Sequence, residues 1–155
     1  MAVSSDLGHP TDVHPRAKKP VGERLARLAL RNDYGKQVEC LAPAATKAFL
    51  NDSGNVTVLF DSPISVPGTM PVRGFRICLE NGSEIPASAE ISGSDAVILS
   101  RDAGRPDAAA DSKNTKADSS TAIVKVKYAW DPWTDANLTG TTGLPVSTFD
   151  IEIGE

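Results

Sequence analysis

At Gly35 the hydrophobic periodicity of this chain changes. Before that residue, apolar side chains recur every three or four residues, the spacing of one face of a helix. After it, short stretches alternate between apolar and polar residues, as strands with one buried face do. One helical stretch followed by many short alternating ones favours a mostly β fold. The 155 residues are enough for one domain, or for a small domain with an additional segment.

The helix is predicted over 16–33. Pro20 is compatible with it because the backbone N–H groups of a first turn have no intrahelical partner, and Gly35 is a suitable end. The apolar stripe consists of Val21, Leu25, Leu28 and Ala29, and the solvated face of Arg24, Arg27 and Arg31. The sequence contains no βαβ unit whose sheet this stripe could cover. We expect it to pack on the β domain, to pack on another chain through self-association of 17–33, or to stay exposed.

The alternating stretches predict an antiparallel β-sandwich. The expected strands are 56–60, 74–80, 88–91, 96–100, 122–130 and 148–153, with weaker candidates at 40–41 and 47–50. Asn81 and Gly82 form a typical two-residue hairpin turn after one of them. In 122–130 the alternation places Tyr128 and Trp130 on one face with Val124 and Val126, which predicts that they are core residues. About seven short strands at this spacing are typical of a sandwich.

The segment 101–120 interrupts the series of strands. It is rich in small and charged residues and has no apolar periodicity, so it cannot bury enough surface to order itself. We interpret it as a flexible insertion between two strands, longer than the usual loop.

Composition and charge exclude two classes of partner. The formal net charge is −4 and the isoelectric point is about 5.2, which gives no basic footprint for nucleic acid. No apolar run approaches the about 20 residues that a helix needs to span a membrane. The start of the sequence does not have the pattern of a signal peptide, because Met1, Ala2 and Val3 are followed at once by polar residues. The compartment stays unknown.

Cys40 and Cys78 are the only cysteines. Two cysteines permit one disulfide but do not argue for it. The alternation places Cys78 on the same strand face as Arg76 and Glu80, which favours a partly exposed thiol. No histidine or second cysteine lies at ligand spacing from either of them, so no metal site is predicted.

Asp12 and His14 lie on a polar loop just before the predicted helix. A carboxylate and an imidazole in such a place can be the orienting and base members of a nucleophilic triad. An Asp-x-His pair also arises by chance, and a solvated loop histidine is the alternative. His14 is preferred over His9 because Pro15 and the helix follow His14 directly.

The sequence around this pair resembles a known enzyme family. The matching motifs in the first 35 residues are DLG at 6–8, DVHP at 12–15, VGERLA at 21–26 and YG at 34–35. They resemble the last catalytic block of sialate O-acetylesterase-like members of the SGNH hydrolases. VKYAW at 126–130, NL at 137–138 and GLPV at 143–146 with Phe149 are similar to the closing strands of that family. The resemblance covers both ends of the chain, but only the C-terminal part of such an enzyme.

The resemblance implies that the parent enzyme removes acetyl groups from sugars by a Ser-His-Asp mechanism without a cofactor. Carried over by position, His14 is the general base and Asp12 its partner. The serine nucleophile and the oxyanion donors of the family come from earlier blocks, which this sequence lacks; Ser53 and Ser94 lie in turns between strands and do not replace them. We therefore expect a C-terminal fragment, inactive alone, whose full-length form acts on an acetylated glycan. Full-length relatives are often secreted or periplasmic.

The same resemblance implies a division at residue 36. Residues 1–36 are expected to be the end of an SGNH-type α/β domain, and 37–155 a separate β-sandwich. An alternative function is a non-catalytic β-sandwich that binds a glycan or a protein. Trp133, on the turn after Asp131 and Pro132, is the candidate for an exposed sugar-stacking platform, although aromatic residues are more often part of a core. A truncated reading frame without a function of its own is the third possibility.

Overall fold

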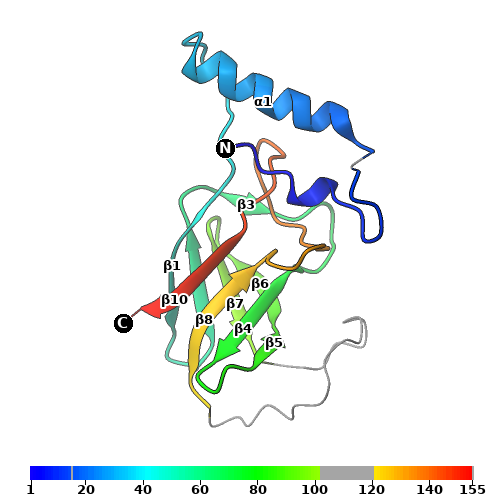
Figure 1. The fold of residues 1–155 in the computed structure, drawn as a ribbon. Helices are drawn as coiled ribbons and strands as arrows, with labels where there is room; N and C mark the ends of the chain where they lie inside the picture. The colour runs from blue at the N-terminus through cyan, green and yellow to red at the C-terminus, as the bar shows by residue number, and fades with distance from the viewer. Residues whose placement is uncertain (15, 102–120, 155) are drawn as a thin grey trace.

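The computed structural model describes residues 1–14, 16–101 and 121–154 (Figure 1). The fold is mostly β, and 13% of it is helical. Its elements are η1 (Ser5–Leu7), α1 (Lys18–Asn32), β1 (Ala45–Leu50), β2 (Val56–Phe60), β3 (Ile64–Ser65), β4 (Phe75–Leu79), β5 (Glu84–Pro86), β6 (Ser88–Ser92), β7 (Ala96–Ser100), β8 (Ile123–Tyr128), β9 (Thr139–Gly140) and β10 (Phe149–Gly154). Apart from Arg101, the predicted insertion 101–120 lies outside the described residues.

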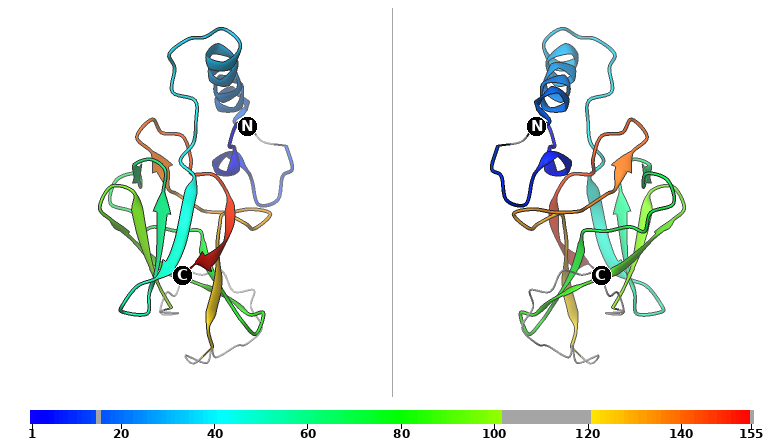
Figure 2. Two further views of the ribbon diagram at one scale, coloured as in Figure 1. Left: turned by 90° about the vertical axis from the view of Figure 1, so that its left-hand side faces the viewer. Right: turned by 90° about the vertical axis from the view of Figure 1, so that its right-hand side faces the viewer.

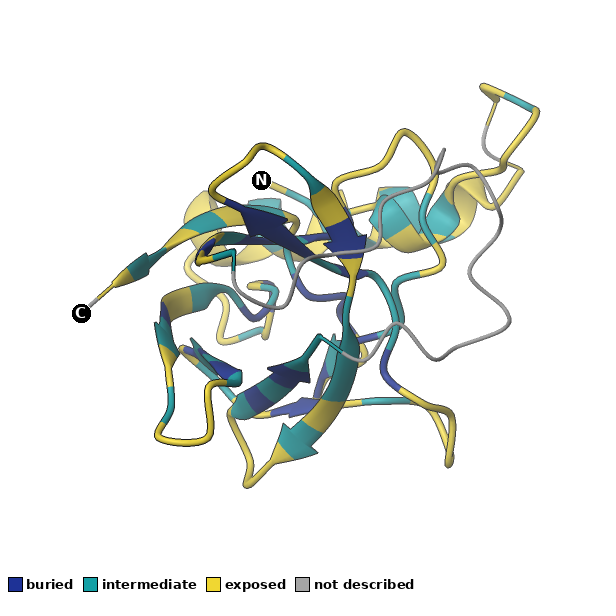
Figure 3. Cartoon of the chain, turned by 90° about the horizontal axis from the view of Figure 1, so that it is seen from below, coloured by how far each residue is buried: buried dark blue, intermediate teal, exposed yellow. Residues whose placement is uncertain are grey.

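Eight of the strands form one sheet in the order β5-β4-β8-β10-β1-β2-β7-β6, while β3 and β9 pair separately. The sheet folds over on itself and is nearly closed (Figures 1 and 3). The prediction of a mostly β fold is confirmed, but one continuous sheet takes the place of two separate ones. Its strand pairs are antiparallel except β1 with β10, which run parallel. These two strands stand almost 100 residues apart, so their direction is not dictated by a hairpin turn.

Most of the expected strands are present within one or two residues of the predicted bounds, and α1 ends within two residues of the predicted helix. The weak candidate at 47–50 is part of β1, whereas 40–41 is not a strand. The hairpin turn after β4 is confirmed, with Gly82 at φ 82°. The two-residue strands β3 and β9 were not predicted, because an alternation needs more than two residues to be visible.

The core lies between the two halves of the folded sheet. Its centre is an aromatic group in which Tyr128 contacts Phe75 and Phe149, with ring centroids 4.7 and 5.5 Å away. The aliphatic side chains around it are fully buried and come from both halves: Val56, Val58, Ile77, Val97, Leu99 and Val126. Figure 3 shows that buried residues lie along the strands of the sheet. The sheet therefore covers its own apolar face.

Two residues that the predicted strand 122–130 placed on the core face are on the outside. Val124 is 40% exposed and Trp130 is 53% exposed, although Tyr128 is buried as predicted. The register of β8 against β4 shifts near Val124, so that Ile123 takes the inward position instead. Ala129 has a positive φ of 51°, which ends the strand and turns Trp130 away from the core. Strict alternation was the wrong rule at both ends of this strand.

Cys78 is buried, not partly exposed as predicted. Ile77, Cys78 and Leu79 are three successive buried residues of β4, at the place where its register against β8 shifts. Burial raises the pKa of the Cys78 thiol. Cys40 is also buried, and neither cysteine is in a disulfide.

Helix α1 lies away from the sheet, on the far side of the N-terminal segment 1–8 (Figures 1 and 2). None of its residues is buried. Leu25, part of the predicted apolar stripe, is 55% exposed, while the side chain of Arg24, expected on the solvated face, is only 11% exposed. The helix thus turns Val21, Arg24 and Leu28 toward the rest of the structure. Gly35 ends it in the left-handed region, at φ 62°.

Candidate functional site

Asp12 and His14 lie in the loop between η1 and α1. The backbone N–H of His14 donates a hydrogen bond to Oδ1 of Asp12 at 2.9 Å, and Nδ1 of the imidazole is 3.5 Å from the same oxygen. The carboxylate therefore fixes the backbone at His14 and lies beside its ring. The His14 side chain is 87% exposed, so its other ring nitrogen faces outward from the described structure. An imidazole held on one side by a carboxylate and open on the other can accept a proton from a group that approaches it.

Arg16 shares the same carboxylate. Its Nε is 3.8 Å from Oδ2 of Asp12, so Asp12 stands between a guanidinium and an imidazole. His9, the rejected alternative, takes part in a local turn instead, in which the backbone N–H of Thr11 donates to its Nδ1 at 3.3 Å. The preference for His14 over His9 stays a prediction.

The start of this loop is held against the helix by Arg24. Its Nη1 and Nη2 donate to the two carboxylate oxygens of Asp6 at 2.6 and 2.7 Å, and Nη1 also donates to the carbonyl oxygen of Val3 at 2.8 Å. The hydrogen bond to Asp6 raises the pKa of Arg24. A bidentate pair of this kind fixes direction as well as distance. The sequence did not indicate it, because the two residues are 18 positions apart and helical spacing places Arg24 on the solvated face.

A small cavity of about 220 Å³ borders the loop. Its lining comes from the N-terminal segment and the first turn of α1: Ser4, Leu7, Gly8, His9, Asp12, Val13 and Val21. This volume is below the about 300–1,000 Å³ that is usual for ligand sites.

Trp133 lies beside the same segment. A Cβ atom built on Gly8 would be 3.7 Å from Cδ1 of Trp133, so the indole packs against the backbone at Gly8. The side chain is nevertheless 45% exposed, and that of Trp130 is 53% exposed. The fold thus brings a partly exposed indole next to a residue four positions before Asp12. Nothing in the sequence could indicate this contact, which joins positions 125 residues apart.

The turn that carries Trp133 is fixed to the sheet. The side chain of Asn137 accepts from the backbone N–H of Arg73 and donates to the carbonyl oxygen of Pro71, both at 2.9 Å. At its end, the backbone N–H of Leu138 donates to the hydroxyl of Tyr128 at 2.9 Å. Two ion pairs support it, Arg76 with Asp131 at 3.1 Å and Arg73 with Asp135 at 3.4 Å. Trp133 is therefore held on a rigid support.

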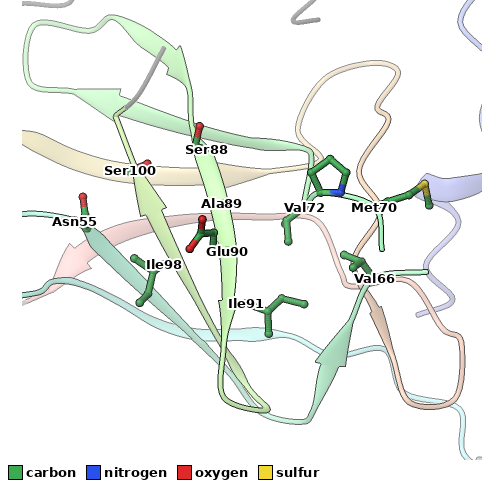
Figure 4. A pocket seen from close by; sticks show the side chains of 11 residues that line it. Asn55, Val66, Met70, Val72, Ser88, Ala89, Glu90, Ile91, Ile98 and Ser100 are labelled. Carbon is green, nitrogen blue, oxygen red and sulfur yellow. The ribbon is translucent and has the colours of Figure 1, made fainter. Parts of the chain in front are cut away.

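A larger cavity, of about 610 Å³, lies at the edge strand β6 (Figure 4). Ile91 and Val72 supply apolar lining, and Glu90 and Asn55 supply polar groups. None of the residues predicted for the site from the sequence lines it. Within the described ranges, no three His, Cys, Asp or Glu side chains gather in a way that could hold a metal ion, and no helix there is long and apolar enough to cross a membrane.

Two of the three comparisons with known proteins gave no match: no family model matches the chain, and no curated protein does. The third found a crystal structure of a carbohydrate acetylesterase from Xanthomonas citri, which is 35% identical over 97% of this chain with a TM-score of 0.76. This chain resembles a carbohydrate acetylesterase over nearly its whole length. It spans only 32% of that enzyme, about a third of its length.

Proposed function

We propose that this chain is the C-terminal part of a sialate-type O-acetylesterase of the SGNH hydrolases. The main support is the likeness to a carbohydrate acetylesterase over 97% of the chain. Further support is that Nδ1 of His14 lies 3.5 Å from Oδ1 of Asp12, since such an enzyme needs a carboxylate beside its base. In this proposal residues 1–36 belong to the hydrolase domain and 37–155 form an attached β domain.

In the proposed reaction, His14 takes the proton of a serine hydroxyl as the serine attacks the acetyl carbonyl carbon. His14 then gives that proton to the departing sugar oxygen, leaving an acetyl-enzyme, and a second cycle with water releases acetate. Asp12 holds the imidazole and stabilises its protonated form. The serine and the oxyanion donors belong to polypeptide outside this sequence, so the chain alone is inactive. Trp133, beside Gly8, would stack on the sugar that carries the ester.

A chimera tests this proposal. The chain replaces the matching third of the Xanthomonas citri acetylesterase, and hydrolysis is followed with an aryl acetate and with an O-acetylated sialic acid. We expect activity in the chimera and none above background in the isolated chain. His14→Ala should lower kcat of the chimera by about 10²–10⁴-fold. His9→Ala, in the same loop, is the matched control and should keep kcat. Esterase activity of the pure isolated chain that disappears in His14→Ala would overturn the proposal.

The second candidate is a non-catalytic glycan-binding module. The exposure of Trp130 and Trp133 on one rigid turn favours it, since aromatic faces stack on sugar rings. Titration of the isolated chain with acetylated and free sialosides, followed by tryptophan fluorescence, tests it. Binding that is lost in Trp133→Ala would support a module that works without the hydrolase domain. An unchanged spectrum at millimolar sugar would remove this candidate.

A further inference from the structure

Beyond its first turn, the outer face of α1 is apolar and has no cover in the described structure. At about 100° per residue, Gly22, Leu25, Ala26, Ala29 and Leu30 share one arc of the helix, separate from the side that faces the N-terminal segment; Lys18 and Lys19 of the first turn lie on the same arc. All of them are exposed except Ala29, which is half-buried. Figure 2 shows this helix seen end-on, above the N-terminal segment and apart from the sheet. The charged residues Glu23, Arg27 and Arg31 lie on the neighbouring arc, which is where a solvated face would be.

Exposed apolar side chains gather in this part of the molecule. Of the eleven large hydrophobic side chains that are exposed in the described residues, six are within the first 41 positions: Met1, Val13, Leu25, Leu30, Tyr34 and Leu41. The sheet, by contrast, fills its own interior, so it offers the helix no apolar surface to cover. An amphipathic helix that buries none of its residues gains little from packing, and most helices in proteins depend on packing.

Gly22 adds a separate observation. Glycine inside a helix costs about 1 kcal/mol relative to alanine. Here a Cβ atom on Gly22 would meet nothing within 4 Å, so the described structure gives no reason for its absence. A glycine on the exposed apolar arc is accounted for if another segment approaches the backbone closely at that point.

We propose that this arc, made of Gly22, Leu25, Ala26, Ala29 and Leu30, docks against the hydrolase-domain polypeptide that carries the serine nucleophile. The proposal rests on the proposed function and names where the missing part attaches. The length of the similar enzyme argues for this occupant over a second copy of the chain. Its matching region is only 32% of its own chain, so the other two thirds are available to cover the equivalent helix.

The test compares Gly22→Leu with Glu23→Leu, two neighbouring substitutions on different arcs of the helix. Leucine is a good helix former and has open space at Gly22 in the isolated chain, so both variants should keep its Tm within about 2 °C. In the chimera with the Xanthomonas citri acetylesterase, Gly22→Leu should lower Tm by about 1–3 °C, while Glu23→Leu should not. Equal effects of the two substitutions in the chimera would overturn the proposal.

A second measurement uses only the isolated chain, in case the chimera does not fold. We expect a monomer by light scattering, and binding of a hydrophobic dye that falls at least twofold in Leu25→Gln but not in Arg27→Gln. A dimer that Leu25→Gln dissociates would overturn the proposal and make a second copy the occupant. Equal dye binding in both variants would also overturn it.

The two proposals fail in different ways. The docking proposal is read from Tm, and the catalytic proposal from the effect of His14→Ala on kcat. If Gly22→Leu lowers the Tm of the chimera but His14→Ala leaves its kcat unchanged, the docking proposal is supported and the catalytic role of His14 is contradicted. If His14→Ala lowers kcat but Gly22→Leu leaves Tm unchanged, the catalytic role is supported and the docking proposal is contradicted.

Discussion

Helix α1 and the sheet bury their apolar residues to opposite extents. Val58 and Leu99 in the sheet are 0% exposed, whereas Leu25 in α1 is 55% exposed and no residue of the helix is buried. Both regions have the apolar periodicity of a packed element. The difference is in what each is packed on: the sheet folds over and covers itself, and the helix rests on a short N-terminal segment. A periodic pattern identifies the apolar face of a helix or strand, but it does not show which part of the structure covers that face.

The largest expected effect comes from the same substitution in the two regions. Leu99→Ala removes a fully buried side chain and leaves a cavity, so it should lower the free energy of unfolding by about 2–5 kcal/mol. Leu25→Ala on the exposed arc of α1 should change it by no more than about 0.5 kcal/mol. Urea unfolding of the isolated chain, followed by circular dichroism, measures both. Comparable losses would mean that Leu25 is covered in solution and that the comparison is wrong.

A smaller effect is expected at the contact that joins the helix to the N-terminal segment. Arg24→Lys cannot keep the bidentate pair with Asp6, so it should weaken this contact by about 1 kcal/mol. Because α1 does not pack on the sheet, the loss should be local. Hydrogen exchange should become faster in 1–32 and stay unchanged in β2, β4 and β8. Arg27→Lys, on the charged arc of the same helix, is the control and should leave exchange unchanged.

A uniform increase of exchange after Arg24→Lys would indicate that the helix and the sheet unfold as one unit. The sheet would then depend on the N-terminal region, against the difference in burial described above.

The sheet was largely predictable because its strands have a long alternating pattern. Val56–Phe60 and Ala96–Ser100 were identified with their exact bounds, since each buries one face throughout. The errors have tertiary causes. Trp130 lies outside the core because Ala129 adopts a positive φ. Arg24 points toward the N-terminal segment because it binds Asp6, 18 residues earlier in the sequence. Neither cause can be read from periodicity.

In the candidate site too, local features were predictable from the sequence and long-range contacts were not. Asp12 and His14 are two positions apart on one loop, so a local pattern was enough to single them out, and the structure places them in contact. Trp133 could be named as an exposed aromatic residue on a turn, but its place beside Gly8 depends on a contact between positions 125 residues apart. The catalytic roles of all three stay predictions.

The smallest expected effect is a difference between the rates at which the two buried thiols, Cys40 and Cys78, are chemically labelled. Cys40 lies in the irregular segment between α1 and β1, whereas Cys78 is held in β4 between β5 and β8. If the helical region opens more often than the sheet, iodoacetamide should label Cys40 on the order of tenfold faster than Cys78, as peptide mapping can measure. The Cys40→Ser and Cys78→Ser variants assign the two rates.

The pH dependence of labelling separates opening from reactivity. The raised pKa of Cys78 keeps its folded thiol protonated at a pH where an unfolded thiol has already lost its proton. The free energy of unfolding therefore falls as the pH rises from the ordinary pKa of a cysteine to the raised pKa of folded Cys78. Labelling of folded Cys78 should therefore rise only above the ordinary pKa of a cysteine. A rise at the ordinary pKa would mean that the reagent meets Cys78 in an opened sheet. If Cys78 were labelled before Cys40, the sheet would open more often than the helical region, at its β5 edge, contrary to the difference in burial described above.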